Sequence, residues 1–72
     1  MREIQIRGDM IRLGQLLKLA DLIASGAEAR DFLAGGEVTV NGGPETRRGR
    51  QLHPGDVVGA PGVELRVVAQ PG

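Results

Sequence analysis

The order of apolar and polar side chains predicts one short strand and two helices in the first half of the chain. Residues 3–7 alternate, with Ile4 and Ile6 on one face, as in a half-buried strand. Residues 12–21 place apolar side chains at the i, i+3, i+4, i+7 positions of an amphipathic helix. A second helix is expected over residues 26–34. Because only a few residues separate the two helices, they should form an αα-hairpin.

The start of the second helix and a glycine in the first helix lead to two further predictions. Ser25-Gly26-Ala27-Glu28 fits a capping box, in which the serine hydroxyl caps the third helical amide and the glutamate reaches back. Gly14 lies inside the first helix, where glycine costs about 0.8–1.0 kcal/mol relative to alanine. Its small size either lets another group approach closely or is simply tolerated in a first turn, and we favour the second explanation.

The second half of the chain is organised around residues 35–58. Residues 38–40 are rich in β-branched side chains, and the Asn-Gly pair at 41–42 favours a tight turn. A Pro-Gly pair at 54–55 predicts another turn, which leads into a short strand at 56–58. Between the two turns lie three arginines, Arg47, Arg48 and Arg50. This pattern predicts a compact β-ribbon that holds a cluster of guanidinium groups.

With a final alternating strand at 63–67, these elements predict an α+β fold: an αα-hairpin packed on a small, bent antiparallel or mixed β-sheet. Residues 1–72 form a single domain, which buries roughly 60% of its unfolded surface. The expected core consists of Ile6, Leu13, Leu16, Leu17, Ala20, Phe32, Leu33, Val38, Val40, Leu52, Val57, Leu65 and Val67.

Charge and composition narrow the class of protein. Nine basic and nine acidic side chains give zero net charge, which argues against a protein that coats nucleic acid through bulk charge. The arginine cluster nevertheless makes a local positive patch. The absence of cysteine excludes disulfides. The N-terminal residues do not read as a signal peptide, and no apolar run approaches the roughly 20 residues of a membrane span. We expect a monomer in the cytoplasm.

Catalytic patterns are missing from the sequence. His53 is the one histidine, no cysteine accompanies it, and neither a Gly-x-Gly-x-x-Gly nor a Walker sequence is present. The carboxylates show no ligand spacing. The sequence therefore predicts no enzyme, no metal, no cofactor and no small-molecule substrate.

Four segments, taken in order, resemble the S-four RNA-binding domain family, which is named after ribosomal small-subunit protein four. They are Arg12-Leu13, Ser25-Gly26-x-Glu28-Ala29-Arg30, Gly36-x-Val38-x-Val40-Asn41-Gly42 and Leu52-x-Pro54-Gly55-Asp56-Val57-Val58. The family also occurs in pseudouridine synthases, tyrosyl-tRNA synthetases and a heat-shock ribosome-rescue protein. The likeness covers about residues 11–58. Segments 13–19 and 45–50 resemble, more narrowly, its short stand-alone bacterial members.

The resemblance implies an alpha-L type RNA-binding fold, with structured RNA (ribosomal RNA or a tRNA-like molecule) lying across the helices and the adjoining loop. Carried over by position, the RNA-binding residues are Arg12, Lys18, Ser25, Arg30, Arg47, Arg48 and Arg50. Many family members have an acid where this chain has Gly14, so a role for that acid is not carried over. Because the helices hold less lysine than those of many relatives, the loop arginines must supply more of the binding.

Other interpretations of these residues stay open. The three loop arginines are also typical of a solvated turn. Lys18 is equally typical of an exposed helix face, and Ser25 of a helix cap. Arg30 has acids nearby, Glu28 and Asp31, with which it can pair. The alternative functions are a β-grasp carrier-like module, disfavoured because the chain ends Gln-Pro-Gly rather than Gly-Gly, and a protein-interaction adaptor that docks through the acidic second helix.

Overall fold

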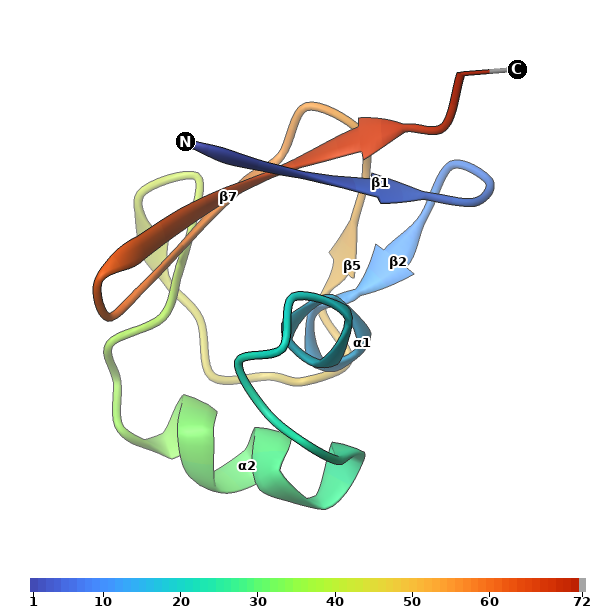
Figure 1. The fold of residues 1–72 in the computed structure, drawn as a ribbon. Coiled ribbons are helices and arrows are strands. Elements are labelled where there is room, and N and C mark those ends of the chain that lie inside the picture. The colour runs from blue at the N-terminus through green and yellow to red at the C-terminus, as the bar shows by residue number, and fades with distance from the viewer. Residues whose placement is uncertain (72) are drawn as a thin grey trace.

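Two helices and seven short strands follow one another along residues 1–71, the part of the chain that the computed structural model describes (Figure 1). In chain order they are β1 (Arg2–Ile6), β2 (Ile11–Arg12), α1 (Leu13–Leu19), α2 (Gly26–Ala34), β3 (Thr39–Val40), β4 (Gly43–Pro44), β5 (Gln51–Leu52), β6 (Val57–Ala60) and β7 (Val63–Ala69). The α+β class is confirmed.

The larger sheet contains five strands in the order β1-β7-β6-β3-β4. β1 runs parallel to β7, with Ile4 opposite Val67, and the other neighbours are antiparallel. The sheet is therefore mixed. Figure 1 shows the first and last strands of the chain side by side.

A separate two-stranded sheet joins β2 to β5, with Ile11 opposite Leu52 and Arg12 opposite Gln51. This pairing corrects the single β-ribbon expected over residues 35–58. β3 and β4 belong to the larger sheet, whereas β5 pairs with the strand that leads into α1. Residues 45–50 therefore cross from one sheet to the other, and we call them the arginine loop.

The αα-hairpin is confirmed, and α1 lies between α2 and the strands (Figure 1). The second helix has the expected bounds, whereas α1 begins at Leu13 and ends at Leu19. The capping box predicted at residues 25–28 is wrong. The Ser25 side chain makes no capping hydrogen bond, and the Glu28 carboxylate accepts from the N–H of Ala24 at 3.1 Å instead. Glu28 thus secures the residue before the N-cap rather than the N-cap itself.

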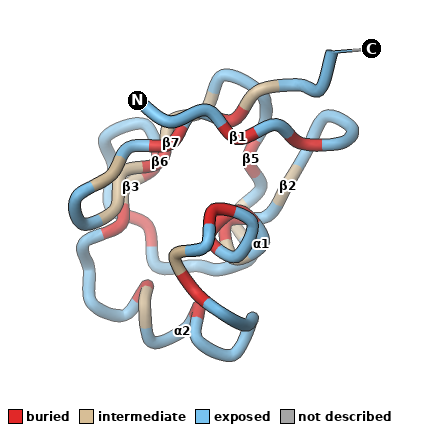
Figure 2. Tube along the Cα trace, viewed as in Figure 1, coloured by how far each residue is buried: buried red, intermediate tan, exposed pale blue. Residues whose placement is uncertain are grey.

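The core fills the space between the sheets and the two helices (Figure 2). All but two of the expected core residues are buried; Phe32 and Val57 are only partly so. In β6 it is Val58, opposite Leu65, that is buried. Because neighbouring strand residues point to opposite faces, a shift of one residue explains this error. The buried apolar residues missing from the expected set are Ile4, Ile23, Ala29 and Val58.

Candidate nucleic-acid interface

The arginine loop docks on the first turn of α1 through backbone hydrogen bonds. The N–H of Leu13 donates to the carbonyl of Arg50 at 2.8 Å, and the N–H of Gly14 donates to the carbonyl of Arg48 at 2.9 Å. Arg12 Nη1 donates to the carbonyl of Gly49 at 3.1 Å. The first amides of a helix lack partners within the helix, so the loop carbonyls act as its cap. This capping fixes the loop against the helix.

Gly14 lies beside both the arginine loop and the second helix. A Cβ atom added there would lie 3.4 Å from Arg48 Cβ, 3.5 Å from the Arg48 carbonyl oxygen and 3.6 Å from Ala29 Cβ. These are ordinary contact distances, so an alanine side chain would fit there, and the geometry agrees with the explanation that we favoured, tolerance of glycine in a first turn. Gly14 is also the second residue of α1, so its cost to the helix falls in the first turn.

Three basic side chains meet around a hollow between the arginine loop and the helices. This helix-side hollow has a volume of about 310 Å³ and is lined by Arg12, Gly14, Gln15, Lys18, Gly26, Ala29, Arg48 and Gly49. Its cations, Arg12, Lys18 and Arg48, are exposed. Within residues 1–71, none of them lies within 4.0 Å of a carboxylate. Glycine and alanine leave the surface between these cations open.

The other two arginines of the cluster lie on a different side of the loop. A second, strand-side hollow of about 580 Å³ is lined by Arg47, Gly49, Arg50, Gln51 and His53. Gly49 lines both hollows. The structure thus divides the predicted cluster into two basic surfaces that share this glycine as a border.

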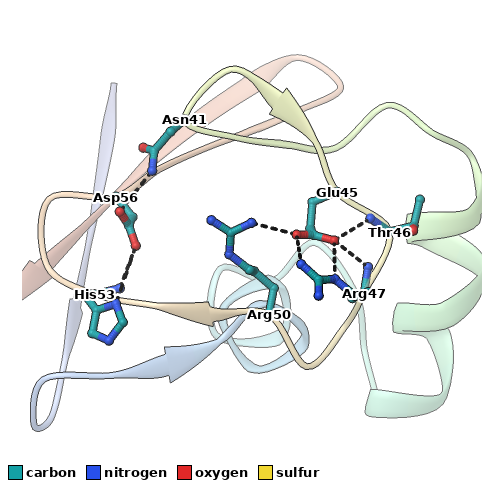
Figure 3. Close-up of polar contacts among 7 residues, drawn as sticks. All are labelled: Asn41, Glu45, Thr46, Arg47, Arg50, His53 and Asp56. Atoms are coloured by element: carbon teal, nitrogen blue, oxygen red, sulfur yellow. Dashed lines mark hydrogen bonds and ion pairs between the residues drawn. The ribbon is translucent and has the colours of Figure 1, made fainter.

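The buried side chain of Glu45 binds both arginines of the strand-side hollow (Figure 3). Its Oε2 accepts hydrogen bonds from the backbone N–H groups of Thr46 and Arg47 and from Arg47 Nε, each at 3.1 Å. Its Oε1 accepts from Arg47 Nη2 at 3.2 Å and from Arg50 Nη1 at 2.8 Å. The three loop arginines are therefore not equivalent: two pair with Glu45, and Arg48 does not.

These contacts lower the pKa of Glu45 to about 2. The main cause is the hydrogen bond from the Arg47 side chain, followed by those from the Arg47 backbone and the Arg50 side chain. Sequence reasoning missed Glu45. The one available signal is its position two residues before Arg47, which places a carboxylate within local reach of the cluster.

Acid is expected to weaken the fold through Glu45. Because its pKa is lowered from 4.5, its stabilising contribution is complete above that value and is lost as the pH falls toward about 2. Urea unfolding at several pH values should show this loss, with a smaller loss in Glu45→Gln. Glu64→Gln, which alters an exposed carboxylate on β7, should keep the parent profile. If Glu45→Gln lost as much stability in acid as the parent does, Glu45 would not be the source of that loss.

Ser25 and Arg30 are less closely involved. Ser25 is exposed and directly precedes Gly26, which lines the helix-side hollow, but Ser25 itself is not among the lining residues. Arg30 is exposed on α2 and lines neither hollow. In the described part of the chain it lies more than 4.0 Å from the carboxylates of Glu28 and Asp31. The structure brings Arg12, Lys18 and Arg48 together and leaves Arg30 apart.

His53 and Asp56 belong to a structural turn. The N–H of His53 donates to Asp56 Oδ2 at 2.8 Å, which, with the side-chain amide of Asn41, lowers the pKa of Asp56. Asn41 also accepts from the N–H of Val57 at 2.9 Å. Positive φ angles at Asn41 (51°) and Gly55 (100°) confirm the two predicted turns. These contacts join the β3–β4 turn to the turn before β6 (Figure 3).

Between positions 1 and 71, no three histidine, cysteine, aspartate or glutamate side chains are grouped as a metal would require. Neither helix in that range has the length and hydrophobicity to cross a membrane.

Comparison with known proteins identifies the same family as the sequence motifs. The model of the S4 (S-four) domain family matches residues 4–68. The chain is also 58% identical, over 55 residues, to the probable ribosome maturation protein RlbA of Bacillus subtilis (strain 168). That alignment covers 76% of this chain and 78% of the relative. The resemblance inferred from the sequence is confirmed, and the chain belongs to the S4 domain family, whose members are generally RNA-binding proteins.

Proposed function

We propose that this protein binds a structured RNA, ribosomal RNA or a tRNA-like molecule, by holding phosphate groups between the arginine loop and the αα-hairpin. The observation that carries the proposal is the helix-side hollow, where Arg12, Lys18 and Arg48 converge without an acidic partner in the described chain. Three such cations repel one another, so an anionic ligand among them is favourable. Arginine also offers donors that match two phosphate oxygens at once.

The proposed mode of recognition is by shape and backbone charge. Phe32 is the one aromatic side chain in the sequence, and it is partly buried against the core. The sequence has no tyrosine or tryptophan, and His53 carries the one well-exposed planar ring in the described chain, so the protein lacks the set of exposed aromatic side chains on which many readers of single-stranded RNA stack unpaired bases. We assign Ser25 and Arg30 to peripheral contacts.

The biological setting is part of the same proposal. The relative RlbA is described as a probable ribosome maturation protein. We accordingly propose ribosomal RNA as the leading target, bound by a cytoplasmic monomer that acts by binding rather than catalysis.

Salt dependence tests the proposal directly. The affinity for a folded RNA should fall steeply as salt rises, because each phosphate contact releases condensed counterions. Arg48→Ala should flatten the slope of log affinity against log salt by roughly 0.7–0.9, the share of one contact. Fluorescence anisotropy with a labelled tRNA transcript and a ribosomal RNA hairpin would measure this.

The matched control is Arg66→Ala, which removes an exposed arginine from β7, outside both hollows. It should leave the slope unchanged. Equal slopes for the parent and Arg48→Ala would show that Arg48 binds no phosphate, and a parent without salt-dependent RNA binding would refute the proposed function.

A further inference from the structure

We propose that Glu45 is a positioning residue of the RNA interface: its carboxylate holds the side chains of Arg47 and Arg50, and the loop between them, in the geometry that binds phosphate. The inference rests on the proposed function, extends the RNA interface from the helix-side hollow to the strand-side hollow, and adds an acidic residue to it. It gives the carboxylate a role opposite to the one that its charge alone suggests.

The geometry leaves donors free for a ligand. Glu45 uses Nε and Nη2 of Arg47 but not Nη1, and it uses only Nη1 of Arg50. The Arg47 side chain remains 74% exposed and that of Arg50 38% exposed, whereas that of Glu45 is only 7% exposed. Glu45 thus binds each guanidinium through part of its donors, and both arginines line the strand-side hollow.

Glu45 also connects the loop backbone to the larger sheet. Its own N–H donates to the carbonyl of Val38 at 3.0 Å, next to β3, while its carboxylate accepts the N–H groups of the next two residues. The N–H of Arg50 donates to the carbonyl of Arg47 at 3.2 Å, which closes a turn with Arg48 in the middle. Glu45 therefore fixes the start of the turn that places Arg48 beside α1.

Preorganisation and electrostatics predict opposite results when the carboxylate is removed. A negative charge beside phosphates is repulsive, so its removal alone should strengthen RNA binding. Arginine side chains that are ordered before binding avoid an entropy cost during binding, which for two such residues is worth roughly tenfold in affinity. The amide of glutamine cannot replace the carboxylate, because its NH₂ group would face donors that now converge on an oxygen.

The test compares Glu45→Gln with Glu64→Gln, which raises the net charge equally but on exposed β7. With a labelled tRNA transcript, at a temperature where circular dichroism shows each variant folded, Glu45→Gln should bind roughly tenfold more weakly. Glu64→Gln should bind as the parent does, or slightly more tightly. A Glu45→Gln protein that binds as tightly as the parent, or more tightly, would overturn the positioning role.

Glu45→Asp keeps the charge but shortens the reach by one methylene. A positioning role predicts weaker binding for this variant too, whereas a purely electrostatic role predicts parent affinity. If Glu45→Gln does not fold, Glu45→Asp distinguishes a positioning role from a purely electrostatic one.

A double-mutant cycle separates positioning from general stability. Arg47→Gln should weaken binding severalfold in the parent and much less in the Glu45→Gln background, because Arg47 is no longer held there. Independent, additive effects would overturn the inference. A parent that binds RNA together with a Glu45→Gln variant that binds more tightly refutes only the positioning role, whereas a parent that binds no RNA refutes the proposed function itself.

Discussion

Replacing Lys18 and Arg48 together with glutamine is expected to lower the affinity for a folded RNA roughly 30-fold at about 0.1 M salt. Two phosphate contacts contribute about 1.4–1.8 to the slope of log affinity against log salt. When the salt concentration falls tenfold, from about 1 M to about 0.1 M, the difference in affinity between the parent and the variant therefore grows by a factor of about 10 to the power 1.4–1.8. Both residues line the helix-side hollow. Neither side chain donates a hydrogen bond within residues 1–71, so the fold should be preserved.

The matched control removes two other exposed arginines, Arg7 and Arg66, which also lie outside both basic hollows. The two double variants have the same net charge, so any difference between them reports position rather than total charge. Equal loss of RNA affinity in both would mean that RNA responds to the overall field and that the helix-side hollow has no special role.

Substitution of Gly14 is expected to separate helix stability from loop docking. Alanine adds only a Cβ at ordinary contact distance from Arg48 and Ala29 and should raise the free energy of unfolding, by up to about 0.8–1.0 kcal/mol. Leucine adds bulk where the loop meets both helices, and overpacking of this kind costs about 1–3 kcal/mol. Gly14→Leu should therefore destabilise the protein, displace the arginine loop and weaken RNA binding at least tenfold.

The two Gly14 variants carry the same charge as the parent, so the comparison is steric. Urea unfolding and RNA anisotropy measure the two effects separately. Gly14→Leu binding RNA as Gly14→Ala does, while folded, would show that neither the hollow nor the docked loop takes part in binding.

Local patterns were sufficient to predict much of the fold. The leucine spacing of α1 and the bounds of α2 follow from helical periodicity, and Asn41-Gly42 adopts the positive φ angles, 51° and 87°, that its chemistry favours. The likeness to a family then placed Arg12, Lys18 and Arg48 in one candidate site, and the structure brings these three together.

What the sequence did not predict depends on contacts between distant residues. β5 is two residues long and pairs with β2, which no local pattern indicates. One error is local instead: Ser25 has the ideal residue type for a cap, yet the Glu28 carboxylate accepts a hydrogen bond from the N–H of Ala24, four residues before it. Val57 and Val58 are chemically alike, so only the pairing with β7 decides which of them is buried.

The site was misjudged for a similar reason. Three arginines within four residues suggested one uniform cluster, because a sequence shows spacing along the chain but not direction. Docking of the loop on α1 turns Arg48 toward the helices, while Glu45 keeps Arg47 and Arg50 on the strand side.

The parallel pairing of β1 with β7 has a consequence for the order in which the chain folds during translation. Arg2 lies opposite Leu65 and Ile6 opposite Ala69, so β1 has no partner strand until β7 is made. At about 5–20 residues per second, that wait is on the order of 3–13 s. The αα-hairpin and the β3–β4 turn are synthesised within this interval and depend mostly on local contacts, which form early. Joining β1 to β7 is then a late step in folding, and it cannot precede emergence of β7 from the ribosomal tunnel.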